Sequence, residues 1–142
     1  MPVDDLARSN VVTATEGTAV SEIAQTMADE TIGSVVIVDD QTPVGIVTDR
    51  DLALRCVAED ADSSEMTAGN VMSENIETIQ QDAGFFEAVD QMSESGIRRL
   101  PVTDGSGDLV GILTTDDLTT LLADEEQGLS NVIEAQRPPY EE

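Results

Sequence analysis

The chain has 142 residues, and its 30 acidic residues against six basic ones give a formal net charge of -24. All six basic residues are arginine, so no basic stripe exists for nucleic acid, and an anionic membrane surface would repel the protein. Because histidine and lysine are absent, imidazole catalysis, a histidine metal site and a lysine nucleophile are excluded, and we expect neither catalytic residues nor a metal site.

Apolar periodicity predicts the elements of the first half in chain order. A short extended segment at 11–13 precedes an amphipathic helix at about 19–30, whose apolar residues recur at i, i+3, i+4 and i+7. A strand at 34–39, which is almost continuously apolar, and a second strand at 44–47 follow, joined by a turn. A last helix begins near Thr48, so the order of elements is β-α-β-β-α.

The second half has the same order of elements. An extended segment, a helix, two strands and a final helix are predicted at 76–78, about 84–95, 100–104, 109–113 and from near Thr114 onwards. Residues 44–52 and 110–118 share six of nine positions at an offset of 66, whereas further upstream the offset is 65. The extra residue falls between the two strands, where Gly105-Ser106-Gly107-Asp108 predicts a longer hairpin turn.

These repeats define the expected domains. One unit of about 50 residues rarely folds alone, so we expect two β-α-β-β-α units packed sheet to sheet, with pseudo-two-fold symmetry, in a mixed α/β (α+β) fold. We place the first domain at 5–57, a polar linker at 58–70, the second domain at 71–123 and an acidic C-terminal tail at 124–142. The tail is expected to be mobile apart from a short helical stretch around 129–133.

A Gly-apolar-apolar-Thr-x-x-Asp pattern opens the last helix of each unit, at 45–51 and at 111–117. Ahead of the second copy stands Ile97-Arg98-Arg99-Leu100-Pro101-Val102. With these residues the chain resembles a tandem pair of CBS domains, the regulatory module named for cystathionine β-synthase, over about residues 5–123. The resemblance implies a regulatory homodimer that binds adenosine-containing ligands, namely AMP, ADP, ATP, S-adenosylmethionine or NAD-like molecules, in two clefts between the repeats.

The resemblance assigns the main ligand-binding residues to the two motifs. Thr48 and Thr114 would position the ligand, and Asp51 and Asp117 would each accept hydrogen bonds from both ribose hydroxyls, which suits a carboxylate. The same Thr-x-x-Asp spacing is also typical of a helix cap, and a carboxylate that folds back onto its own backbone is less free to take a ribose. Arg98 would face the ligand phosphates, and strand alternation predicts that Arg98 and Arg99 point to opposite faces.

Further residues carry weaker assignments by analogy. The extended segment of each repeat would read the adenine in the opposite cleft. This places Asn10, Val11 and Val12 opposite Asp117, and Asn75, Ile76 and Glu77 opposite Asp51. Gly33 takes the place of Arg98 in the first repeat, and Arg50 takes that of Asp116, so we expect two unequal sites. For Arg50 a salt bridge to a neighbouring acid is an equal alternative.

Three functions follow as hypotheses. The first is an adenosyl-ligand sensor that signals to an unknown effector protein and requires no cofactor, its regulatory ligand being an adenine nucleotide or S-adenosylmethionine. The second is a ligand-free CBS pair that serves as a dimerisation module. The third, an enzyme that uses carboxylates alone, is disfavoured. Scarce basic residues favour monophosphates or S-adenosylmethionine over triphosphates.

The charge and the single cysteine indicate the environment. At about 1 M salt the Debye length is roughly 3 Å, so acidic self-repulsion is screened, and the composition favours an extreme halophile with a salt-filled cytoplasm. Cys56 cannot form an internal disulfide and falls in a predicted helix, where a small buried side chain is its expected role. No transmembrane run and no signal-peptide core are present, so we expect a cytoplasmic protein.

Overall fold

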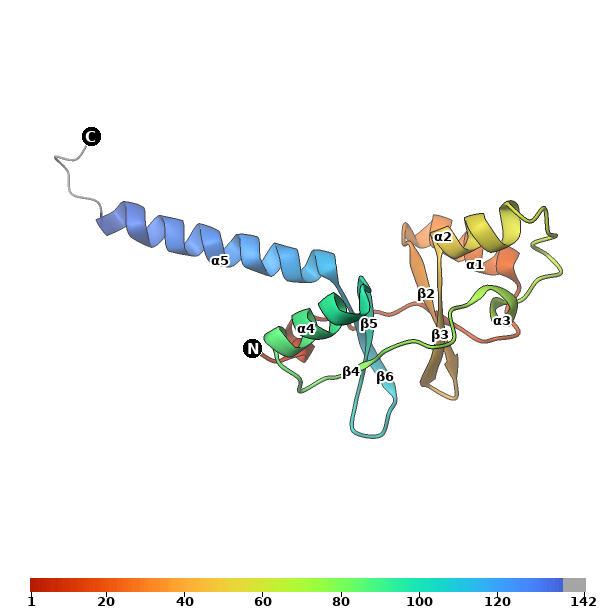
Figure 1. The fold of residues 1–142 in the computed structure, drawn as a ribbon, viewed down its shortest axis with the longest axis horizontal. Helices are drawn as coiled ribbons and strands as arrows, with labels where there is room; N and C mark the ends of the chain where they lie inside the picture. The colour runs from red at the N-terminus through yellow and green to blue at the C-terminus, as the bar shows by residue number, and fades with distance from the viewer. Residues whose placement is uncertain (137–142) are drawn as a thin grey trace.

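The computed structural model describes residues 1–136, which form two similar α/β halves and a long C-terminal helix (Figure 1). The first half contains a 3-10 turn η1 (Val3–Asp5), β1 (Thr13–Ala14), α1 (Val20–Glu30), β2 (Ser34–Asp39), β3 (Thr42–Thr48), α2 (Asp49–Leu52) and a π-helical turn η2 (Ala53–Val57). The second half contains α3 (Ala68–Val71), β4 (Ile79–Gln80), α4 (Phe85–Ser95), β5 (Arg99–Thr103), β6 (Leu109–Thr114) and α5 (Thr115–Gln136).

Each half carries one three-stranded sheet, in the orders β1-β2-β3 and β4-β5-β6. In both sheets the first two strands are parallel and the last two antiparallel. The β2–β3 hairpin closes at Asp39 and Thr42, whereas in the β5–β6 hairpin the last strand pair is Thr103 with Leu109, so the second turn is longer, as predicted. The mixed α/β fold with two repeats is confirmed.

The extended segments are displaced from their predicted positions. Residues 11–13 and 76–78 were expected to be strands, but the strands lie at Thr13–Ala14 and Ile79–Gln80. The first of these segments joins its sheet late: Val36 N–H reaches the carbonyl oxygen of Val12 at 3.2 Å, but the strand ladder begins only at Thr13. The residues before each short strand are therefore free to line the space between the two halves.

The helices bury most of the faces that periodicity predicted, although Val89, which the pattern also places on the apolar face of α4, is exposed. On α1, Val20, Ile23 and Met27 are buried, and on α4 the buried residues are Ala88 and Met92. Cys56 is buried in η2, in agreement with its expected packing role.

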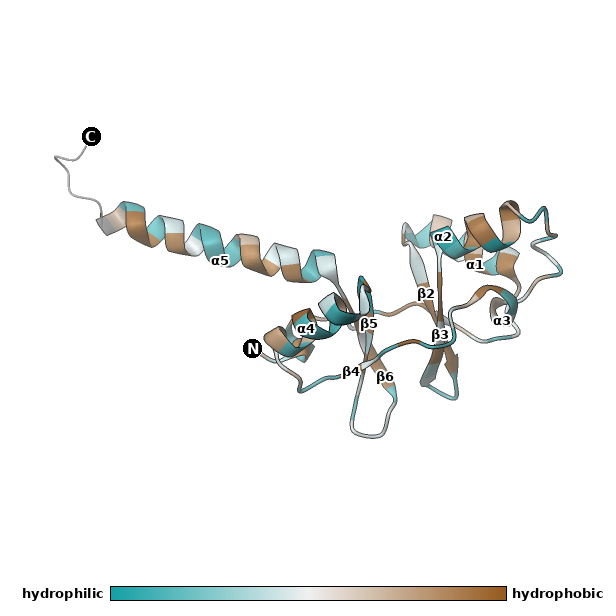
Figure 2. Cartoon of the chain, viewed as in Figure 1, coloured by the Kyte–Doolittle hydropathy of each residue, from teal (hydrophilic) through white to brown (hydrophobic). Residues whose placement is uncertain are grey.

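The expectation for the tail was wrong over the described residues, because α5 continues without a break to Gln136. It leaves the body of the protein, and hydrophobic and hydrophilic residues alternate along its length (Figures 1 and 2). Gln127 and Asn131 are hydrogen-bonded one turn apart on it, which supports helix beyond the predicted stretch. Residues 137–142 lie outside the described residues.

The leading segment of each half packs on the core of the other half. Val3 is fully buried in the second core, where its N–H donates to the carbonyl of Ala83 at 2.7 Å. In return Ala68, Val71 and Met72 are buried in the first core, against the helix α1. The N-terminal segment therefore lies on the side of the second half, and in Figure 1 the N-terminus is beside α4. The predicted linker is thus partly a structural element of the first half, while the domain limits themselves stay a prediction.

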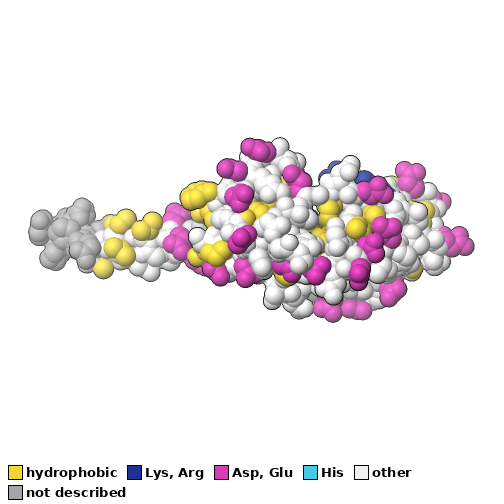
Figure 3. Space-filling model, turned by 90° about the horizontal axis from the view of Figure 1, so that it is seen from below, with side chains coloured by type: hydrophobic (Ala, Val, Ile, Leu, Met, Phe, Trp, Pro, Cys, Tyr) yellow, Lys and Arg dark blue, Asp and Glu magenta, His cyan; other side chains and the backbone are white. Residues whose placement is uncertain are grey.

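Acidic side chains are scattered over the face that Figure 3 shows, whereas arginine appears there at one place. Among residues 1–136 the structure contains a single ion pair, between Arg8 and Asp117. No helix within these residues combines the length and the apolar character that a membrane crossing requires.

The two equivalent helices end differently. Both α1 and α4 close with a residue in the left-handed conformation, Thr31 at φ 56° and Gly96 at φ 64°. In both helices that residue's N–H bonds to the carbonyl of a methionine, Met27 or Met92. A β-branched residue is strained in this region, whereas glycine is not.

We predict that Thr31→Gly raises the free energy of unfolding by about 1 kcal/mol, because relief of the left-handed strain exceeds the added flexibility of the unfolded chain. The reciprocal change Gly96→Thr should lower the free energy of unfolding by a similar amount. Thermal unfolding of both variants at fixed high salt measures this pair of shifts. If Thr31→Gly instead destabilises the protein, the end of α1 is not strained.

Candidate functional site

Each half receives a backbone segment of the other half across its last strand. Arg8 pairs with Ile112 of β6 through two hydrogen bonds of 2.9 Å, and Ser73 pairs with Ile46 of β3 through bonds of 3.0 and 3.3 Å. Arg8 and Ser73 are equivalent in the repeat, at the offset of 65. These two crossings form one wall of each of the two cavities described below.

The motif glycines make the crossings possible. A Cβ atom added to Gly111 would lie 3.0 Å from the carbonyl oxygen of Arg8, and one added to Gly45 would lie 3.1 Å from that of Ser73. Side chains here would push the crossing segments away from the strands. The close backbone approach at both glycines is therefore made by the chain's own leading segments.

The first cleft is a cavity of about 420 Å³ between the halves. It brings together Thr48 of the first motif, the extended segment that precedes β4, and two arginines, of which Arg98 directly precedes β5 and Arg99 is its first residue. Its lining residues are Ile46, Thr48, Ser73, Asn75, Ile76, Glu77, Ser95, Ile97, Arg98, Arg99 and Pro101.

The second cleft, of about 230 Å³, is built from equivalent positions of the other repeat. It joins Thr114 of the second motif to the extended segment that precedes β1. Its lining residues are Arg8, Asn10, Val11, Val12, Thr31, Ile32, Gly33, Ser34, Val36, Arg99, Ile112, Thr114 and Asp116. The structure thus brings each predicted extended segment to the predicted Thr, and Gly33 takes the place that Arg98 has in the first cleft.

Both Thr-x-x-Asp motifs form helix caps. Thr48 N–H donates to Asp51 Oδ2 at 2.9 Å, and Asp51 N–H donates to Thr48 Oγ1 at 3.2 Å. The second motif has the same reciprocal pair, at 3.0 and 3.2 Å, and Thr114 Oγ1 also lies 3.0 Å from Asp117 Oδ2. Each cap uses Oδ2, and neither carboxylate is among the residues that line the two clefts. The capping alternative is therefore realised, with one carboxylate oxygen left over in each motif.

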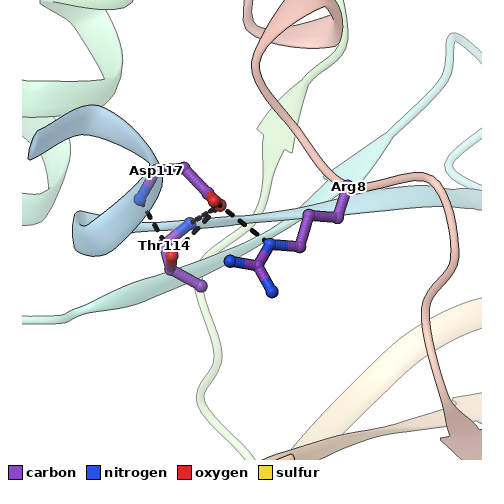
Figure 4. Close-up of polar contacts among 3 residues, drawn as sticks. All are labelled: Arg8, Thr114 and Asp117. Carbon is purple, nitrogen blue, oxygen red and sulfur yellow. Dashed lines mark hydrogen bonds and ion pairs between the residues drawn. The ribbon is translucent and has the colours of Figure 1, made fainter. Parts of the chain in front are cut away.

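The remaining oxygens of the two aspartates differ. Arg8 Nε donates to Asp117 Oδ1 at 3.1 Å, and Figure 4 shows the two side chains pointing toward one another beside Thr114. Within residues 1–136 no group is hydrogen-bonded to Asp51 Oδ1. Both carboxylate oxygens of the second motif thus have partners, whereas Oδ1 of the first motif has none among the described residues.

The arginines depart from expectation in two respects. Arg98 and Arg99 both line the first cleft, and Arg99 also lines the second, so the expectation that alternation lets only one of them reach a given cleft was wrong. The reason is that β5 begins at Arg99, so Arg98 precedes the strand and does not follow its alternation. Arg50 is exposed on α2, lines neither cleft and forms no salt bridge with a described residue. Neither the expected ligand contact nor the alternative salt bridge is therefore seen at Arg50.

Sequence reasoning missed Arg8 and Arg99 as cleft residues. Arg8 lies two residues before Asn10, and its counterpart Ser73 lies two residues before Asn75. Extending the repeat alignment by two residues upstream would have shown that an arginine in one cleft corresponds to a serine in the other. No sequence signal, however, indicated the pair between Arg8 and Asp117.

One acceptor in the first cleft lacks a partner. Glu77 Oε2 is buried and makes no hydrogen bond in the structure. The equivalent residue in the second cleft is Val12, which has no polar side chain. A buried, unpaired carboxylate oxygen costs free energy, and a donor on a bound molecule would satisfy it. Among the described residues, no cluster of three His, Cys, Asp or Glu side chains could hold a metal ion.

Comparison with known proteins identifies the two repeats. A family model described as CBS domain matches residues 3–57 and 68–124. An uncharacterized protein of Methanopyrus kandleri is 40% identical over 117 residues, which cover 82% of this chain and 60% of that protein. The chain thus spans about 60% of the length of this curated relative.

Two solved structures show ligands in similar proteins. The CBS domain pair of protein MJ0100, in complex with 5′-methylthioadenosine and S-adenosylmethionine, is 27% identical with a TM-score of 0.79, covering 88% of this chain and 98% of that one. The CBS domain protein PAE2072 from Pyrobaculum aerophilum, complexed with AMP, is 26% identical with a TM-score of 0.74, covering 82% of this chain and 89% of that one.

We predict that Glu77→Gln raises the free energy of unfolding of the ligand-free protein by about 1 kcal/mol, because a neutral amide is less costly to bury without a partner than a carboxylate. Thermal unfolding without added ligand measures the shift. Glu74→Gln is the matched control, since it removes the same charge from an exposed side chain. Equal shifts in both variants would trace the gain to net charge and not to the buried oxygen.

Proposed function

The chain belongs to the CBS-domain family, and from this premise we propose that it is a regulatory module that binds one adenosine-containing ligand in each of its two clefts. The observation that carries the proposal is the pseudo-symmetric pair of cavities, each of which unites a motif threonine with the extended segment of the other repeat. The ligands named for MJ0100 and PAE2072 support this ligand class.

The first cleft offers a suitable set of groups for such a ligand. The aliphatic side chains of Ile46, Ile76 and Ile97 give apolar surfaces for the faces of an adenine ring. Asp51 forms the capping box with Thr48, which lines the cavity, and its Oδ1, to which no described group is hydrogen-bonded, would accept a ribose hydroxyl. We therefore assign Thr48 and Asp51 to the ribose.

The phosphate side of the proposal rests on the two neighbouring arginines. Arg98 and Arg99 both line the first cleft, in a chain with six basic residues in all. Guanidinium groups bind phosphate with charge-assisted hydrogen bonds. Two arginines against a net charge of -24 favour a monophosphate or S-adenosylmethionine over a triphosphate. The second cleft, at about 230 Å³, is smaller than typical small-molecule sites, so its ligand requires some opening of the cavity.

The ligand acts as a signal in this proposal and not as a substrate. We further propose that the module works as a cytoplasmic homodimer and passes its ligand state to an effector protein. Because the clefts lie between the halves, a ligand contacts both repeats at once, and its binding free energy favours one arrangement of the halves over others. A molar-salt environment would supply the screening that the acidic surface requires.

A ligand-free dimerisation module is the second candidate, and one observation favours it. Both motif aspartates already serve as helix caps, through Asp51 Oδ2 and Asp117 Oδ2. In a pair without ligand these caps would be the whole role of the motifs. The two candidates differ in whether adenosine compounds bind.

We predict that AMP or S-adenosylmethionine raises the free energy of unfolding, by about 2.7 kcal/mol at a ligand concentration 100 times its dissociation constant. Thermal unfolding in about 2 M KCl, a salt level that screens the acidic surface, measures the effect against AMP, ATP, S-adenosylmethionine and NAD. Guanosine monophosphate is the control for non-specific nucleotide effects. If no adenosine compound shifts the midpoint, the dimerisation module is the better description.

Site assignment follows from single variants. Asp51→Asn and Asp117→Asn keep an amide oxygen for the helix cap but lose the charge that binds a ribose hydroxyl strongly. Each variant should lower the ligand stoichiometry in calorimetric titrations from two sites to one, while its ligand-free midpoint stays close to that of the parent. Two intact sites in either variant would remove that aspartate from the proposed ribose contact.

A further inference from the structure

The contact between Arg8 and Asp117 is unusual for this chain. It is the one ion pair among residues 1–136, although acids outnumber bases five to one. The backbone of Arg8 is held by two hydrogen bonds to Ile112, so its side chain starts from a fixed point next to the second motif. Asp117 has 12% of its side chain exposed and Arg8 66%, so the carboxylate is the enclosed partner and the guanidinium remains accessible.

Arg8 belongs to two places at once. It lines the second cleft together with Thr114 and Arg99, and its Nε donates a hydrogen bond to Asp117 Oδ1. That carboxylate has too few acceptor positions left for both ribose hydroxyls, because Oδ2 accepts from the N–H and Oγ1 of Thr114 and Oδ1 already accepts from Arg8 (Figure 4). A ribose can place both hydroxyls on Asp117 only if the guanidinium moves away.

The energy of that displacement depends on the ligand. Adenosine would separate Arg8 from its carboxylate and offer no anion in exchange. A ligand phosphate would offer the displaced guanidinium a new anionic partner, in a geometry that arginine binds well. The cost of breaking the pair is then offset by the pair that forms.

We propose that Arg8 sets the ligand selectivity of the second cleft: it competes with the ribose for Asp117, so that this cleft takes phosphorylated adenosines and discriminates against uncharged or cationic ones. The inference rests on the proposed function. The first cleft has no such competitor, because Ser73 stands in the position of Arg8 and Asp51 Oδ1 is free. It also holds the unpaired oxygen of Glu77, which suits a donor or a cation. The first cleft therefore accepts adenosines with or without phosphate, since it also holds Arg98 and Arg99, and the two clefts differ in selectivity and not only in affinity.

The test compares AMP with adenosine at the second cleft alone. Asp51→Asn weakens the first cleft, and isothermal titration of this full-length variant in about 2 M KCl then reports on the second. AMP should bind more tightly than adenosine. Adding Arg8→Gln should tighten adenosine about threefold to fivefold, the range of an exposed ion pair, and weaken AMP, so that the preference for phosphate falls. Arg8→Lys should retain most of the preference, because it keeps the charge.

The repeat supplies the reciprocal experiment. In an Asp117→Asn background, Ser73→Arg places an arginine at the equivalent position of the first cleft. It should weaken adenosine binding there and leave AMP binding equal or tighter. Gln127→Glu on α5 is the control for net charge, since it changes the charge by the same amount as Arg8→Gln at an exposed position outside both clefts. This variant should leave the ratio of AMP affinity to adenosine affinity unchanged in both clefts.

The outcomes separate this inference from the proposed function. If the parent protein binds neither AMP nor adenosine, the proposed function fails. If both ligands bind but Arg8→Gln leaves adenosine affinity in the second cleft unchanged or weaker, the competition between Arg8 and the ribose is wrong while the ligand-binding function stands. If Arg8→Gln tightens adenosine binding in the second cleft and lowers the preference for AMP over adenosine, the inference is supported.

Discussion

The exchange of leading segments between the halves is the constraint on which the rest of the structure depends. Neither half completes its core by itself: the second core needs Val3, and the first needs Ala68 and Val71. Each exchanged segment must cross the last strand of the other half, and it does so where Gly45 or Gly111 leaves room. The clefts lie next to these crossings, so core packing and cavity formation have one cause. A ligand between the halves therefore binds where the two folding units are already interdependent.

The scarcity of positive charge gives each arginine unusual influence. Arg98 and Arg99 line the first cleft, Arg99 and Arg8 line the second, and Arg55 donates to the carbonyls of Val71 and Met72. Four of the six basic residues are thus engaged between the halves. On an ordinary surface such contacts would be minor, but here they act against a background of dispersed carboxylates (Figure 3).

The sequence was sufficient for the architecture because the signals were local and repeated. Alternating and helical periodicities located both sheets, the apolar faces of α1 and α4, and the longer second hairpin. The resemblance to CBS domains also indicated which extended segment faces which motif, and each segment lines a cleft together with the threonine of that motif. Errors arose where tertiary contacts decide. Residues 11–12 and 76–78 precede the strands to which they were assigned, because each segment joins its sheet late, and the helix beyond residue 124 has weak local signals, including Gly128.

Tertiary contacts also decide which atoms of the site are hydrogen-bonded, so these contacts could not be predicted from the sequence. A Thr-x-x-Asp pattern specifies a cap and a ribose contact with the same two residues, and only the positions of Oδ1 and Oδ2 separate those roles. The partner of Asp117 comes from 109 residues away, so no window of sequence contains the pair. Divergence between repeats is nevertheless visible in sequence: Arg8 against Ser73, and Val12 against Glu77. Because both substitutions fall on equivalent walls of the clefts, the pseudo-symmetry that builds two sites also provides the positions at which they came to differ.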